Sequence, residues 1–153
     1  MDDEDLILEG LKNSLEAGAS AIDIYVDGCS FSIVDDGRMD TLPAFREGFS
    51  SKGERRGRGL YLLSEVTGGR CGIRREKERT CLSGTFSHRI AVEKVIPYCF
   101  NLFPELVFHR LERGREIYVL SGAMLESRGI DVHLISGLAH LKRIIREKEQ
   151  RSL

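Results

Sequence analysis

Hydrophobic residues near the start of the chain recur at the spacing of an amphipathic helix. Between residues 5 and 17, Leu11 follows Ile7 and Leu8 by four and three positions, and Leu15 follows Leu11 by four. Gly18 follows this run, and glycine is the residue that most often ends a helix. The pattern predicts a first helix over residues 5–17.

The pattern then changes to the two-residue alternation of β-strands. Residues 22–26 alternate apolar and polar side chains, an Asp27-Gly28 turn follows, and residues 31–34 are again apolar, which predicts a β-hairpin. A short buried helix is predicted over residues 59–66. A second hairpin follows it, with strands near residues 70–74 and 80–90 and a solvated tip, RREKER.

Two stretches show no simple period. Residues 35–58 hold four glycines, a proline and mixed charges, and loops of this length in a compact domain are often lids or binding loops. Beyond Ala91 the chain is too apolar for a solvated tail, with a strand in EIYVLSGAML and an amphipathic helix over residues 138–150. We expect residues 93–153 to extend the sheet of a domain formed by residues 1–92. The alternative is an apolar patch for a partner or a second copy.

Composition restricts the class of protein. The 153 residues suffice for one domain, and 41% hydrophobic content provides a core. Lysine and arginine (23) nearly balance aspartate and glutamate (24), so no overall field attracts nucleic acid or an anionic membrane. No apolar run is long enough to span a membrane, and the acidic start MDDED is unlike a signal peptide. We expect a cytoplasmic protein.

The cysteines and histidines give no metal motif. The four cysteines show no C-x-x-C spacing and are expected to be free thiols. The alternative is a disulfide or shared metal between Cys71 and Cys81, across a hairpin centred on Glu76. The four histidines also lack metal-binding spacing.

Candidate chemistry lies in an ordered series of short motifs. Glu9 and Asn13 stand one helical turn apart, on the face opposite the leucine stripe, where side chains are ordinarily only solvated. A strand ending in Asp35-Asp36-Gly37 follows, then the long loop, and then Gly57-Arg58-Gly59-Leu60 at the start of a helix. The order of these motifs is more specific than any one of them.

In this order the motifs resemble those of the GHKL ATPase superfamily, which includes DNA gyrase, the sensor histidine kinases and the MutL mismatch-repair proteins. The segments that carry the resemblance are EGLKNSLEAGAS (the N-box), IVDDGRMD (the first glycine box), FREGFSSKGERRGRGLYLL (the F-box and second glycine box) and SGTFSHRI (the G-T-x-F strand). It covers about residues 5–92. It implies a Bergerat-type α/β sandwich, a mixed sheet with helices on one face, that binds ATP and Mg²⁺.

The resemblance also implies roles for individual residues. Asn13 would ligate Mg²⁺ through its amide oxygen, and Glu9 would act as general base toward the γ-phosphate. Asp35 would accept the adenine amino hydrogen, whereas by itself the Asp-Asp-Gly triplet indicates only a turn. Further contacts to the nucleotide would come from Gly37, Lys52, Gly57, Arg58, Gly59, Leu60 and Thr85.

The sequence also departs from the family pattern. Met39 replaces the second glycine of the first box, and the loop from Gly37 to Gly57 is shorter than in most sensor kinases. We therefore expect weaker nucleotide binding and slow turnover. Because only eight residues precede Glu9, we expect no phosphoacceptor helices and not a complete sensor kinase.

Three hypotheses follow. The first is a small Mg²⁺-dependent enzyme that hydrolyses ATP or transfers its γ-phosphate to a serine or histidine of a partner protein; the acceptor stays open. The second is an ATP-gated interaction module with little catalysis. A homodimer is one possible assembly of such a module. The third is a nucleic-acid binder using the arginines of the second hairpin, which interleaved glutamates and the absence of aromatic residues argue against.

Overall fold

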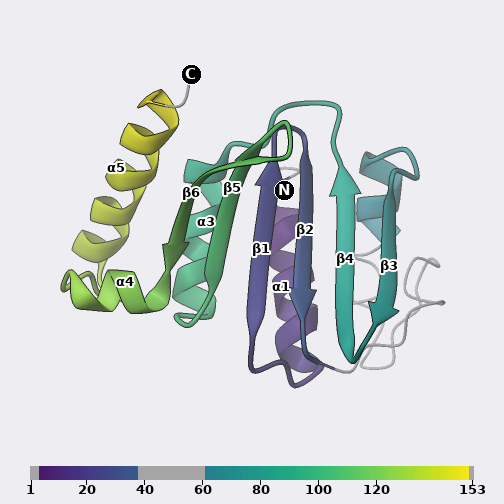
Figure 1. The fold of residues 1–153 in the computed structure, drawn as a ribbon, viewed down its shortest axis with the longest axis horizontal. Helices are drawn as coiled ribbons and strands as arrows, with labels where there is room; N and C mark the ends of the chain where they lie inside the picture. Colours follow the sequence, from purple (N-terminus) through teal and green to yellow (C-terminus); the bar gives the residue numbers. More distant parts are fainter. Residues whose placement is uncertain (1–3, 38–60, 152–153) are drawn as a thin grey trace.

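The computed structural model describes residues 4–37 and 61–151. Within these ranges the chain forms six strands and several helices (Figure 1). Residues 61–66 are also helical. The other elements in chain order are α1 (Asp5–Glu16), β1 (Ile22–Asp27), β2 (Ser30–Asp35), β3 (Cys71–Glu76), β4 (Arg79–Thr85), α3 (Val92–Leu102), β5 (Val107–Glu112), β6 (Arg115–Ser121), α4 (Gly122–Ser127) and α5 (Ile135–Arg151).

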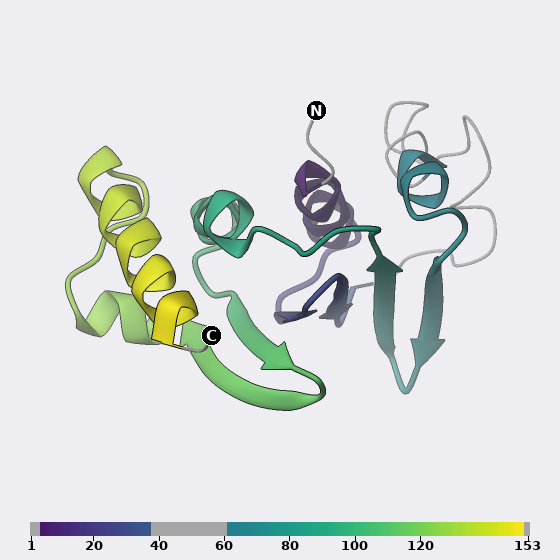
Figure 2. The ribbon, with the colours of Figure 1, turned by 90° about the horizontal axis from the view of Figure 1, so that it is seen from above.

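All six strands belong to one sheet with the order β3-β4-β2-β1-β5-β6. β1 and β5 are parallel and every other neighbouring pair is antiparallel, so the sheet is mixed. Viewed along the sheet, α1, α3, α5 and the helix at residues 61–66 lie on one face (Figure 2). This confirms the predicted α/β sandwich.

Both predicted hairpins are present, with local corrections to the second. Gly28 has a φ of +60°, which suits the two-residue turn between β1 and β2. In the second hairpin the turn consists of only Lys77 and Glu78, both with positive φ, and β4 ends at Thr85 rather than near residue 90. The predicted tip RREKER therefore contributes most of its residues to the strands.

The register of this hairpin shows that the Cys71–Cys81 alternative is wrong. Cys71 lies opposite Gly84, and Cys81 lies opposite Arg74. Because odd and even positions of a strand face opposite sides, the two thiols point to different faces of the sheet. All four cysteines are free thiols.

The C-terminal part of the chain is joined to the same sheet. β5 pairs along β1, and Phe100, Leu106 and Phe108 are completely buried in the common core. Its local elements were harder to predict, because α3 contains Pro97 and is apolar on much of its surface. A domain boundary between residues 92 and 93 stays a prediction.

Among the described helices, none combines the length and the apolar character that crossing a membrane requires. The cytoplasmic location stays a prediction.

Candidate functional site

The site begins with a close contact between α1 and the sheet. A Cβ atom on Gly10 would lie 2.7 Å from Leu82 Cδ2 and 2.9 Å from Ile33 Cδ1, so a larger residue would force these side chains to shift. Ser14 is one helical turn farther along and is buried against the same strands. The glycine therefore brings Ser14 to the end of β2, where Asp35 lies.

Asp35 is a buried carboxylate at the end of β2, with 3% of its surface exposed. Its Oδ2 atom accepts a hydrogen bond from Ser14 Oγ at 2.6 Å, and its Oδ1 atom accepts one from the backbone N–H of Gly37 at 2.8 Å. A Cβ on Gly37 would lie 3.0 Å from the same Oδ1, which explains the small residue there. Each carboxylate oxygen has a further lone pair, so Asp35 can accept from a ligand as well.

The neighbouring Asp36 has a different task. Its carboxylate accepts hydrogen bonds from Ser20 Oγ at 2.6 Å, Ser20 N at 2.7 Å and Ala21 N at 3.0 Å. These bonds, led by the Ser20 hydroxyl, lower the pKa of Asp36 to about 2. Asp36 thus ties the start of β1 to the end of β2, whereas Asp35 faces the helix layer.

Glu9 and Asn13 lie on α1 at the border of its buried face and are themselves partly buried. The buried face is centred on Ile7, Gly10 and Ser14 rather than on the leucine stripe, so both residues lie nearer to the core than expected. The Nδ2 atom of Asn13 is buried and has no hydrogen-bond partner among the described residues. Glu9 accepts a 3.4 Å hydrogen bond from Lys12, and its side chain is 29% exposed.

The structure separates Thr85 from Asp35. Ser30 of β2 lies opposite Thr85, and their hydroxyl groups are 2.9 Å apart, whereas Asp35 is at the other end of β2. Five residues of strand, roughly 16 Å, separate the two positions. The residue opposite Asp35 is Thr80, which is 1% exposed. Thr80, rather than Thr85, therefore lies beside Asp35, and a nucleotide contact from Thr85 stays a prediction.

The architecture was then compared with known proteins. Neither protein-family models nor curated protein sequences match the chain. Among solved structures, the N-terminal domain of a DNA repair protein has 14% identity and a TM-score of 0.52, over 87% of this chain and 57% of that one. An Aquifex aeolicus MutL ATPase domain complexed with ADP has 18% identity and a TM-score of 0.48, over 84% of this chain and 67% of that one.

The chain shares its fold with the N-terminal domain of that DNA repair protein. At these identities the likeness shows the fold alone. The chain spans little more than half the length of the DNA repair domain.

In this fold, the residues of α1 and β2 that are predicted to bind adenine and metal lie near one another. The contact of Ser14 with Asp35 places the Asp35 carboxylate directly beside α1, the helix that carries Glu9 and Asn13. The predicted phosphate-binding residues Lys52, Gly57, Arg58, Gly59 and Leu60, and also Met39, lie outside the described residues. The roles of these residues in the site stay predictions.

Sequence analysis missed three residues of this site: Ser14, Thr80 and Arg75. Ser14 lies within the N-box and is one turn after Gly10, so helical spacing alone places it on the buried face. Arg75 was grouped with the solvated arginines of the hairpin. Its Nη1 atom donates instead to Gly37 O at 2.7 Å and to Thr80 Oγ1 at 2.8 Å.

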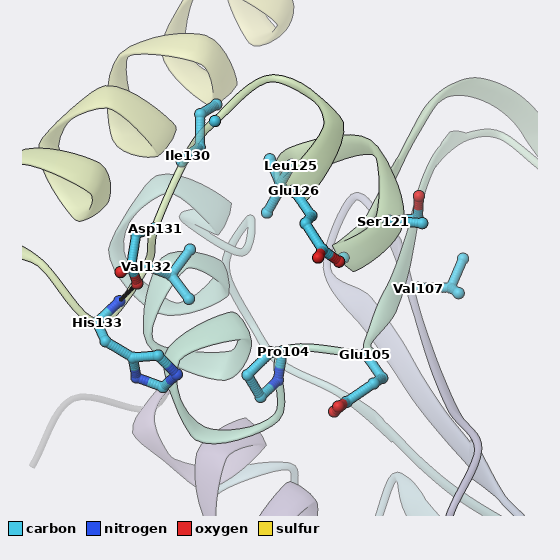
Figure 3. Close-up of a pocket in the computed structure, with 13 residues that line it drawn as sticks. Pro104, Glu105, Val107, Ser121, Leu125, Glu126, Ile130, Asp131, Val132 and His133 are labelled. Atoms are coloured by element: carbon cyan, nitrogen blue, oxygen red, sulfur yellow. Dashed lines mark hydrogen bonds between the residues drawn. The ribbon is translucent and has the colours of Figure 1, made fainter.

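A cavity of about 620 Å³ lies elsewhere, among β5, β6, α4 and the segment that leads to α5 (Figure 3). Glu105, Glu126 and His133 are among its lining residues. It contains none of the predicted site residues, so it is not the site that the motifs indicate.

Proposed function

We propose that the chain is a Mg²⁺-dependent ATP-binding protein that hydrolyses ATP or transfers its γ-phosphate to a partner protein. The observation that carries the proposal is the buried Asp35 carboxylate, held by Ser14 and Gly37 beside the helix of Glu9 and Asn13. A buried carboxylate with fixed donors on both oxygens is a directed acceptor for one further N–H group. The amino group of adenine supplies that N–H, and guanine has a carbonyl in its place.

The polar groups on α1 fit the phosphate and metal end of such a ligand. The Asn13 amide has an unpartnered buried atom, and rotating the amide by 180° exchanges its nitrogen and oxygen. Mg²⁺ prefers oxygen ligands and retains several waters, so one amide oxygen together with phosphate oxygens suffices. Bound Mg²⁺ would neutralise charge on the transferring phosphate. Gly37, Lys52, Gly57, Arg58, Gly59 and Leu60 are proposed to contact the nucleotide.

Glu9 is proposed as the general base toward the acceptor of the γ-phosphate. It lies one turn before Asn13, and its partly exposed carboxylate leaves room for a water or a hydroxyl group. Water, serine and histidine acceptors are all compatible with this arrangement.

One observation favours the second candidate, an ATP-gated interaction module with little catalysis. Lys12 contacts the Glu9 carboxylate at 3.4 Å, so Glu9 already has a partner on its own helix. In this function ATP would present a surface to a partner protein or to a second copy. Measured turnover separates the two functions.

The proposed ATP site is tested by thermal unfolding with and without ATP and Mg²⁺. A ligand that binds only the folded state raises the melting temperature by mass action. Asp35→Asn should remove most of this increase, because an amide nitrogen then faces the adenine amino group. Asp36→Asn is the matched control, since it changes an adjacent carboxylate used only within the fold.

Both variants are first checked for the wild-type circular-dichroism spectrum. A full ATP-dependent increase in the Asp35→Asn variant would remove Asp35 from the nucleotide site. No increase in the wild-type protein would contradict ATP binding itself.

A further inference from the structure

We propose that Arg75 sets the hydrogen-bond polarity of the purine end of the site and so makes it specific for adenine. The inference rests on the proposed ATP-binding function. Its starting point is a row of three residues on neighbouring strands: Arg75 on β3 lies opposite Thr80 on β4, which lies opposite Asp35 on β2. Their side chains share the helix-covered face, because Thr80 and Asp35 are buried there.

Arg75 occupies one of the two lone pairs of the Thr80 hydroxyl and so limits how that group can turn. A guanidinium group only donates hydrogen bonds, so the 2.8 Å contact from Arg75 Nη1 makes Thr80 Oγ1 an acceptor. A hydroxyl group has one hydrogen of its own to donate. Thr80 is 1% exposed, and no described residue accepts that hydrogen within bonding distance. The hydroxyl is therefore a buried donor that a ligand can satisfy.

Asp35 beside it is the opposite kind of group. Its carboxylate accepts from Ser14 on one oxygen and from Gly37 on the other, and it can accept once more. The row thus presents an acceptor next to a donor. Adenine matches this order with its amino group and its adjacent ring nitrogen N1. Guanine and hypoxanthine present a carbonyl and an N1–H, which is the reverse order.

Arg75 also fixes the geometry of the acceptor. The same Nη1 atom donates to Gly37 O at 2.7 Å, and the N–H of Gly37 is one of the two donors that hold Asp35. Without Arg75, the Thr80 hydroxyl is free to rotate and accept, and the Gly37 turn loses its link to β4. Because Arg75 does not itself touch the purine, it is a positioning residue.

The test compares the affinities of the full-length protein for ATP, GTP and ITP, measured by calorimetry with Mg²⁺. Arg75→Met should reduce the preference for ATP over GTP and ITP by roughly tenfold or more, mainly through weaker ATP binding. Arg75→Lys keeps a donor and should retain most of the preference. Arg74→Met is the matched control, because Arg74 lies opposite Cys81 on the other face of β3.

A second comparison separates this role from general damage to the fold. Thr80→Val removes the hydroxyl at nearly constant volume, and its effect on the ATP preference should not add to that of Arg75→Met in the double variant. Equal losses of ATP, GTP and ITP affinity in Arg75→Met, or additive effects on the preference, would overturn the inference while leaving ATP binding intact. A wild-type protein that binds no nucleotide would instead overturn the proposed function, and this inference with it.

Discussion

A buried charge network joins the C-terminal helix α5 to the sheet. We expect the loss of its carboxylate and the loss of its arginine to destabilise the fold by different amounts. Arg110 on β5 has only 2% of its side chain exposed, and its Nε atom donates to both carboxylate oxygens of Glu149 on α5, at 3.1 and 3.0 Å. Its Nη2 atom lies 3.0 Å from Glu112, and Tyr118 donates to Glu149 at 2.6 Å. Burial and the hydrogen bond to Glu149 raise the pKa of Tyr118, so its hydroxyl stays protonated.

The two ends of this network differ in their access to water. Glu149→Met leaves the Arg110 guanidinium buried with only Glu112 and backbone carbonyls, and it removes the acceptor of Tyr118. Removing one member of a buried pair costs about 3–5 kcal/mol, so we expect about 2–4 kcal/mol here because Glu112 remains. Arg110→Met leaves two carboxylates that are 23% and 33% exposed and that water can reach. We therefore expect a loss of about 1 kcal/mol or less.

Urea unfolding followed by circular dichroism measures these losses, and the linear dependence on denaturant gives the free energy of unfolding. The double variant Arg110→Met/Glu149→Met should be more stable than Glu149→Met alone, because no unpaired charge stays buried. The reasoning is refuted if Arg110→Met is at least as destabilising as Glu149→Met, or if the double variant shows the sum of the two losses.

Three further predictions concern the site and the C-terminal part. Because the folded pKa of Asp36 is about 2 and its ordinary value is 3.8, its stabilisation is complete above about pH 4 and is lost as pH falls toward 2. Acid should therefore destabilise the wild type more than Asp36→Asn in urea unfolding, and equal losses would contradict this. Glu9→Gln should lower ATP turnover by roughly 10² or more while ATP still raises the melting temperature; unchanged turnover favours the module. Truncation after Ala91 removes β5 and exposes the edge of β1, so the shortened chain should aggregate; a soluble monomer that binds ATP would contradict this.

Features set by local sequence were predicted well. α1 follows from leucine spacing and Gly18, and the first hairpin follows from its alternation and from Gly28, whose positive φ the turn requires. The buried faces of β1 and β2 also follow from this alternation. What periodicity does not give is the contact of Gly10 with Leu82, because that contact joins residues far apart in the chain.

The positions of Thr80 and Thr85 show a limit of motif matching. The G-T-x-F motif placed Thr85 in the site, but which residues of neighbouring strands lie opposite each other depends on the turn that joins the strands. A two-residue turn formed by Lys77 and Glu78 puts two non-glycine residues at positive φ, and sequence rules favour asparagine or glycine there. Once that turn is known, pairing places Thr80 beside Asp35 and sends Thr85 to the far end.

The C-terminal elements show a different limit. Pro97 lies inside α3, although proline usually ends a helix, and the buried environment of α3 makes it apolar beyond one stripe. The parallel pairing of β5 with β1 is a contact across more than 80 residues, and no local pattern specifies it.

The two parts of the molecule meet at β1, which pairs with β2 on one edge and with β5 on the other. This arrangement raises the question of whether a change in one part alters ligand binding in the other. The Arg110–Glu149 network and Asp35 share no partners, and distant sites without shared partners usually act additively on stability. ATP with Mg²⁺ should therefore raise the free energy of unfolding of Glu149→Met by the same increment as that of the wild type, although the variant starts from a lower value. The two increments are compared by urea unfolding at equal free ATP concentrations. A smaller increment in the variant would show that the C-terminal helix shapes the nucleotide site through β1, and it would contradict the independence argued here.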